Sequence, residues 1–130
     1  MAAPKYASEQ YVKYFFSAEA VTARPTQWEV ALHTGLPAAG NEKELSSFSY
    51  ARQPVSFSIE EKTAHFEATN TTAITFPTGM ASDSGTITHY TVRDKAANKM
   101  LAVAAFPLPI TYENGVQVII PAEQIKIRGI

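Results

Sequence analysis

The chain has 130 residues, no cysteine, and a formal net charge of −1 from 11 basic and 12 acidic side chains. This length predicts a single domain over residues 1–130, and the 45% of hydrophobic residues argues against intrinsic disorder. The lack of cysteine excludes disulfides and cysteine-ligated metal sites. The balanced charge gives no electrostatic drive towards nucleic acid or a membrane surface, so neither is an expected partner.

The first predicted element is a helix over residues 7–20. Apolar side chains recur there at spacings of three and four, with polar side chains between them. Ser8 has the side chain of an N-cap, and Pro25 closes the element because a residue before proline avoids the helical region. No basic stretch followed by an apolar run marks a secretory signal, and the longest apolar run, 100–109, is too short to span a membrane.

After Pro25 the pattern changes to short strands separated by turn residues. Pro54 has no backbone N–H to donate, so its strand is expected at a sheet edge or at a bulge. Two hairpins are expected, one joining 86–92 to 99–106 and one turning at Asn114-Gly115 between 110–112 and 116–120. The further strands are predicted at 27–34, 50–59, 63–68, 73–76 and 124–130.

About eight closely spaced strands behind one helix predict an all-β fold. We expect an antiparallel β-sandwich or a jelly-roll-like barrel over residues 26–130. No helical segment separates the strands, which disfavours a nucleotide-binding βαβ fold.

The residues that carry chemistry show no catalytic pattern. His33, His65 and His89 lie in three different predicted strands without the spacing of a metal site, so a three-histidine site would need the fold to gather them beside a carboxylate. Neither a G-x-S-x-G elbow nor a phosphate-binding glycine loop is present. The sequence therefore predicts a protein that is not an enzyme and that uses no cofactor and no metal.

Three short segments, in order along the chain, carry a resemblance to known proteins. They are A-L-H-T at 31–34, S-Y-A-R-Q at 49–53 and G-T-I-T-H at 85–89. With the aromatic helix and the last strand, they resemble short virion structural proteins of tailed bacteriophages, a family labelled as tail-fibre, minor structural or capsid decoration proteins. The chain departs from that pattern in the loop after Thr34, which is not acidic and glycine-rich, and at Ser84, where relatives often carry tryptophan.

The resemblance implies a non-enzymatic component of the virion, assembled in the host cytoplasm. It implies binding to other virion proteins, such as the major capsid or tail proteins, and a homo-oligomer. A capsid decoration (cement) or head-associated protein is the leading hypothesis, because no fibrous repeat or coiled coil precedes the domain. The alternatives are a small tail or tail-fibre protein in host attachment, and a carbohydrate-binding module that would need Tyr50, Tyr90 and Tyr112 on one exposed face.

Three regions are candidates for interfaces. The predicted helix carries more aromatic surface than a small core needs, the long polar loop 35–49 is exposed, and the last strand has no following turn to protect its edge. The candidate interface residues are Tyr11, Tyr14 and Phe15 in the helix, Glu42, Glu44 and Phe48 in the loop, and Ile125, Ile127 and Ile130 in the last strand.

Overall fold

The computed structural model describes residues 3–129, which form one helix and nine strands. The elements are α1 (Lys5–Phe16), β1 (Trp28–His33), β2 (Gln53–Val55), β3 (Phe57–Glu61), β4 (Phe66–Asn70), β5 (Ile74–Thr75), β6 (Thr86–Asp94), β7 (Lys99–Thr111), β8 (Ile119–Ile120) and β9 (Lys126–Arg128). All strand pairs are antiparallel. The all-β class with one N-terminal helix is confirmed.

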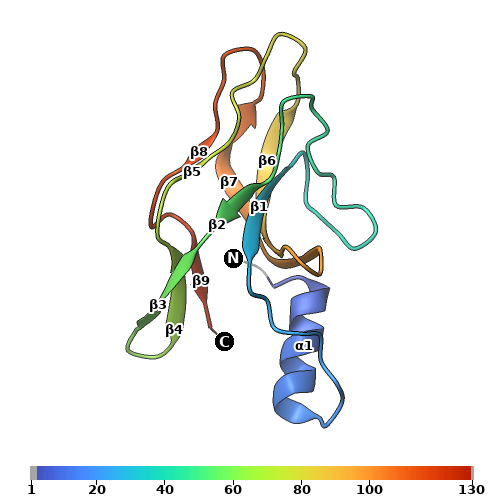
Figure 1. Cartoon of the computed structure of the whole chain (residues 1–130), viewed down its shortest axis with the longest axis vertical. Helices are drawn as coiled ribbons and strands as arrows, with labels where there is room; N and C mark the ends of the chain where they lie inside the picture. Colours follow the sequence, from blue (N-terminus) through green and yellow to red (C-terminus); the bar gives the residue numbers. More distant parts are fainter. Residues whose placement is uncertain (1–2, 130) are drawn as a thin grey trace.

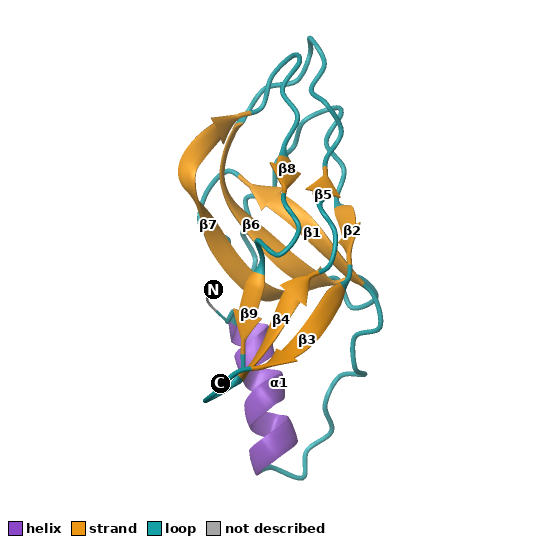
Figure 2. Ribbon diagram, turned by 90° about the vertical axis from the view of Figure 1, so that its left-hand side faces the viewer, coloured by secondary structure: helices purple, strands orange, loops and turns teal. Residues whose placement is uncertain are grey.

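The strands form two layers, as expected for a sandwich. One layer is the four-stranded sheet β2-β1-β6-β7, and the other combines the three-stranded sheet β3-β4-β9 with the pair β5-β8 (Figure 2). Apolar side chains of both layers are buried between them, from Val30 and Leu32 of β1 to Phe76 and Ile125 on the opposite side. Each fully buried Leu, Ile or Phe side chain contributes about 2 kcal/mol.

The strand predicted at 50–59 is two strands in two different sheets. Residues 53–55 pair with β1, and after Ser56 the chain crosses to the other layer and pairs with β4. Pro54 lies opposite Glu29 in the outermost strand of its sheet, which confirms the edge position. The crossing could not be seen in the sequence, because apolar and polar residues alternate without interruption through both strands.

The predicted hairpin of β6 and β7 is confirmed, with Asp94 opposite Lys99 at its turn. β7 continues beyond the predicted end at residue 106 to Thr111. Its prolines, Pro107 and Pro109, fall in a register shift of the β6–β7 pairing, where no ladder hydrogen bond is needed from them.

The second predicted hairpin is wrong. A turn forms at Glu113–Val116, with the Val116 N–H donating to the Glu113 carbonyl at 3.0 Å. The returning chain, however, pairs with β5 rather than with the strand before the turn. Backbone bonds from Phe76 to Val118 and from Gly79 to Val116 hold it there. A turn signal fixes a reversal of the chain, and tertiary packing decides which strand becomes the neighbour.

The helix begins and ends earlier than the sequence pattern predicts. Pro4 in an extended conformation precedes its first turn, so Ser8 lies inside the helix and is not the N-cap. At the other end, the Ser17 hydroxyl and N–H both donate to the Lys13 carbonyl, and the helix ends at Phe16, nine residues before Pro25. The helix projects from one end of the sandwich beside β7 (Figure 1), and none of its residues is buried.

Candidate interaction surfaces

The first candidate surface is the aromatic face of α1, formed by Tyr11, Tyr14 and Phe15. The Phe15 ring lies 5.0 Å from the Tyr11 ring and 4.9 Å from the Tyr14 ring, measured between centroids. Tyr14 and Phe15 are 68% and 62% exposed. With the returning segment Val21–Arg24 they line a hollow of about 410 Å³. The structure therefore brings the three predicted helix residues together on one open face, which is typical of a binding surface.

The second candidate surface, the loop 35–49, is held to the body by a polar clamp. Arg52 donates two hydrogen bonds to the Glu44 carboxylate, at 2.8 and 2.7 Å, and one to Glu29 at 2.9 Å. The Tyr50 hydroxyl also donates to Glu44 and accepts from the N–H of Leu32. Burial alone would raise the pKa of Glu44, but the bonds from Arg52 and Tyr50 outweigh it and hold that pKa below its usual value.

A second set of polar contacts fixes the same loop from the other side. The guanidinium of Arg93, which is 1% exposed, donates to Glu42 at 2.6 Å and to the Asn98 side chain at 3.1 Å. His33 is fully buried between the Glu42 carbonyl at 2.7 Å and the Thr91 hydroxyl at 2.8 Å. We assign the proton to Nδ1, since a carbonyl can only accept, so Nε2 accepts from Thr91.

This environment of His33 predicts a pH dependence of stability. Burial lowers the pKa of His33, and the charge of Arg93 adds to that effect. Below pH of about 6.5 the unfolded chain therefore takes up a proton that the folded protein does not. The free energy of unfolding should fall as pH drops from about 6.5 to the lowered pKa, by at most about 1.4 kcal/mol per pH unit.

The matched variant is His33→Gln, whose amide can make both hydrogen bonds but does not titrate. Urea denaturation of both proteins between pH 7 and 5 measures the effect. Equal slopes of stability against pH in the two proteins would show that His33 is not responsible.

The clamp changes the interpretation of the two predicted loop carboxylates. Glu42 and Glu44 are engaged in intramolecular ion pairs with Arg93 and Arg52, and we infer that they position the loop. Phe48, in contrast, is 87% exposed. Together with Leu36, which is 64% exposed, it is an apolar side chain of the loop that is open to a partner.

Phe48 is presented by a well-fixed turn. Asp83 accepts hydrogen bonds from the Ser47 hydroxyl at 2.6 Å and from the Ser49 N–H at 2.8 Å, on either side of Phe48. It also accepts from the Met80 N–H. The bonds from Ser47 and Ser49 hold the pKa of Asp83 well below its usual range. The partners of this aspartate lie more than 30 residues earlier in the chain, so local sequence does not reveal them.

The last strand differs most from the prediction. Ile125 is fully buried in the core, where its N–H donates to the Asn70 side chain at 2.8 Å, so it is not available to a partner. Ile127 packs partly against the core. β9 pairs with β4 along one edge. Ile130 lies outside the described residues.

One exposed apolar surface was missed by sequence reasoning. Ile59 and Ile127 are both register partners of Ala68, and Phe66 lies two residues before it, so the three side chains share one face of the sheet β3-β4-β9. Ile59 and Phe66 are 69% and 58% exposed. We call Ile59, Phe66 and Ile127 the apolar overhang. The alternation of apolar and polar residues in these strands is visible in the sequence and predicts that one face of the sheet is buried. It does not show that the opposite layer ends before it covers this part of the face.

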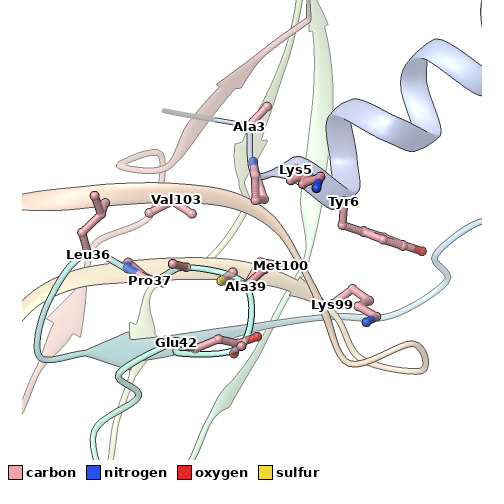
Figure 3. A pocket seen from close by; sticks show the side chains of 13 residues that line it. Ala3, Lys5, Tyr6, Leu36, Pro37, Ala39, Glu42, Lys99, Met100 and Val103 are labelled. Atoms are coloured by element: carbon pink, nitrogen blue, oxygen red, sulfur yellow. The ribbon is translucent and has the colours of Figure 1, made fainter.

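A further hollow of about 490 Å³ lies between the start of α1, the loop 36–42 and β7 (Figure 3). Its walls are mainly apolar, with Pro37, Met100 and Val103 among them. Its charged lining residues are Lys5, Glu42 and Lys99, and the Glu42 carboxylate is already paired with Arg93.

The residues considered for metal or sugar binding are placed elsewhere. His33 and His89 are opposite each other in β1 and β6, and His65 lies near Glu67 on the other sheet, at 3.7 Å. Within residues 3–129 no three His, Asp or Glu side chains converge on a possible metal position. Tyr90 and Tyr112 are buried in the core. They therefore cannot form an exposed sugar-stacking platform with Tyr50.

The polar side chains of this sandwich hold its own loops, while its aromatic side chains on α1 and in the loop 35–49 face water. Exposed aromatic side chains of this kind are typical of a protein surface that binds other macromolecules. The chain belongs to the family described as podophage GP4 fiber I protein gp80, which matches residues 2–128. This confirms the resemblance to virion structural proteins of tailed phages. No curated protein matches the chain. Among the described residues, α1 is not long and apolar enough to cross a membrane.

Proposed function

We propose that the chain is a non-enzymatic structural component of a podophage fibre, joined to other virion proteins through the aromatic face of α1. The observation that carries this proposal is the exposure of Tyr14 and Phe15 on a helix with no buried residue. An aromatic side chain buried in an interface contributes about 2 kcal/mol, and repetition over many copies makes weak attachment persistent.

The family description favours the fibre over the capsid. It names a fibre protein, whereas the capsid decoration hypothesis rested on the lack of a fibrous repeat in the sequence. A short domain can belong to a fibre without a repeat if neighbouring copies or other chains supply the length. Host attachment would then involve the fibre as an assembly, with this chain as one of its parts.

The test is a phage that carries Tyr14→Ser and Phe15→Ser in this chain. We expect its amount in purified virions, measured by mass spectrometry against the major capsid protein, to fall more than about tenfold. The matched control is Leu108→Ser on β7, which removes a 76% exposed apolar side chain from another element. Undiminished incorporation of the double variant, or recovery of the protein with tail-free capsids, would contradict the proposal.

A further inference from the structure

We propose that the hollow between α1, the loop 36–42 and β7 binds a segment of another virion protein in which an acidic side chain lies next to apolar ones. The apolar side chains rest on Met100 and Val103, and the carboxylate lies between Lys5 and Lys99. The inference rests on the proposed function for one point, that the chain has protein neighbours in the virion. It uses a separate surface, since this hollow shares no lining residue with the one beside the aromatic face of α1.

The hollow has the size and the walls of a binding site. Its volume of about 490 Å³ lies within the range of about 300–1,000 Å³ that is typical of such sites. Met100 and Val103 line it and are buried, and Leu36 lines it and is exposed. A leucine side chain of a partner that rests on these residues leaves water, which stabilises the contact by about 2 kcal/mol.

One end of the hollow is basic. Lys5 and Lys99 line it, and no ion pair among residues 3–129 involves either of them. The Lys99 ammonium lies 5.9 Å from the centre of the Tyr6 ring, which keeps it beside the first turn of α1. Figure 3 shows these three residues at one end of the hollow and Leu36 and Pro37 at the other. The occupant should therefore be anionic at one end and apolar at the other.

The acidic side chains near these lysines have partners of their own. They are Glu9 in the next turn of α1, Glu42 in the wall of the hollow, and Asp94, which is opposite Lys99 in the β6–β7 hairpin. Glu9 pairs with Lys13 at 2.8 Å, and Glu42 pairs with a buried arginine at 2.6 Å. Asp94 accepts from two backbone N–H groups of its turn, at 3.1 and 3.3 Å. Charge complementarity therefore favours an occupant that brings its own carboxylate.

The loop wall of the hollow is in place before any partner binds. Arg93 holds the Glu42 side chain and His33 holds the Glu42 carbonyl, while two backbone hydrogen bonds between Ala38 and Asn41, at 3.1 and 3.0 Å, close the turn next to it. A preformed wall loses little conformational entropy on binding, so a short segment is enough to give affinity. A fibre protein has other proteins as its neighbours in the particle, which favours a protein segment over a small free anion.

An array of overlapping peptides that covers the other virion proteins of the same phage tests the chemistry of the occupant. We expect the purified protein to bind peptides in which Asp or Glu lies beside apolar residues, and Lys5→Glu with Lys99→Glu to weaken this binding about tenfold. The matched control is Lys62→Glu with Lys126→Glu, which makes the same change of charge at the exposed sheet β3-β4-β9. Binding of no peptide, binding of peptides without an acidic residue, or an equal loss in the control would overturn the inference.

A photo-cross-linker tests the same contact in the particle. Ala39 lines the hollow and is exposed, so a phage that carries p-benzoylphenylalanine at this position should cross-link there to an acidic segment of another virion protein, identified by mass spectrometry. The same group at Leu108, which does not line the hollow, should not give this cross-link. Cross-links from position 39 only to a second copy of this chain, or to a segment without Asp or Glu, would contradict the inference. The peptide array uses purified protein, so failure of virion incorporation through α1 leaves its result unaffected.

Discussion

Replacement of Arg93 by alanine is expected to lower the free energy of unfolding by about 4 kcal/mol. Arg93 is the largest of the fully buried side chains. Its removal leaves a cavity, deprives Glu42 of its partner and takes from the Asn98 side chain one of its two arginine donors, the other being Arg52 at 2.7 Å. A lysine could not replace it, because one ammonium group cannot reach two partners in the fork geometry of a guanidinium.

Urea denaturation measures this effect, and Arg52→Ala is the matched control. Arg52 also holds the loop through a carboxylate, but its side chain is 26% exposed, so we expect a loss of only about 1 kcal/mol. Both variants should speed tryptic cleavage at Lys43, because each releases one side of the loop. If Arg93→Ala lowers the free energy of unfolding no more than Arg52→Ala does, the buried arginine is not the main anchor of the loop.

The second large effect is expected from one added methyl group, in Gly79→Ala. A Cβ at this position would lie 2.1 Å from the Glu113 carbonyl oxygen and 2.9 Å from its carbon, both backbone atoms. Gly79 also donates to the Val116 carbonyl at 2.8 Å and accepts from the Gly115 N–H at 2.9 Å. The two segments cannot separate without breaking these bonds, so we expect a loss of about 3 kcal/mol.

The matched control for Gly79 is Gly115→Ala, in the same pair of segments. The Cβ of an alanine there would meet nothing within 4 Å, so its cost comes only from the positive φ of 82°, about 1 kcal/mol. Thermal and urea denaturation compare the two. A Gly79→Ala protein as stable as the control would show that the segments 76–79 and 113–118 can move apart without cost.

Local sequence predicted the parts of the fold that local chemistry determines. β1 and the β6–β7 hairpin carry a clear apolar period and a polar turn, and both are where the pattern placed them. The predictions of strand pairing were wrong where residues distant in the sequence determine which strands become neighbours. The crossing at Ser56 and the pairing of β8 with β5 depend on which strands are already neighbours, and that information lies in no single segment.

For the candidate surfaces too, features that depend on local spacing could be predicted, and features that depend on distant residues could not. The aromatic face of α1 could be predicted because helical spacing alone collects Tyr11, Tyr14 and Phe15. The burial of Ile125 could not, since it depends on Asn70, 55 positions earlier in the chain. Glu42 and Glu44 were predicted as interface residues, and their intramolecular arginine partners could not be foreseen because Arg93 and Arg52 are not neighbours in the sequence.

The segments that carry the family resemblance have structural roles. The tyrosine and arginine of S-Y-A-R-Q form the clamp on Glu44, and the histidine of A-L-H-T fixes the loop backbone. The glycine of G-T-I-T-H, at a φ of +151°, makes room for Leu45, since a Cβ there would lie 2.6 Å from Cδ1. In this chain the three segments therefore form the scaffold of the loop, while the outward side chain of Phe48 is not part of them.

The two ends of the molecule are unequal, and this gives the subunit a direction. α1 and the sheet β3-β4-β9 lie at one end, and the loops 77–85 and 112–118 lie at the other (Figure 1). If the subunit is attached through α1, as proposed, its loop end points away from the attachment. The loops 77–85 and 112–118 would then be the outermost part of each subunit, and changes in their length would alter what the fibre presents without disturbing its attachment.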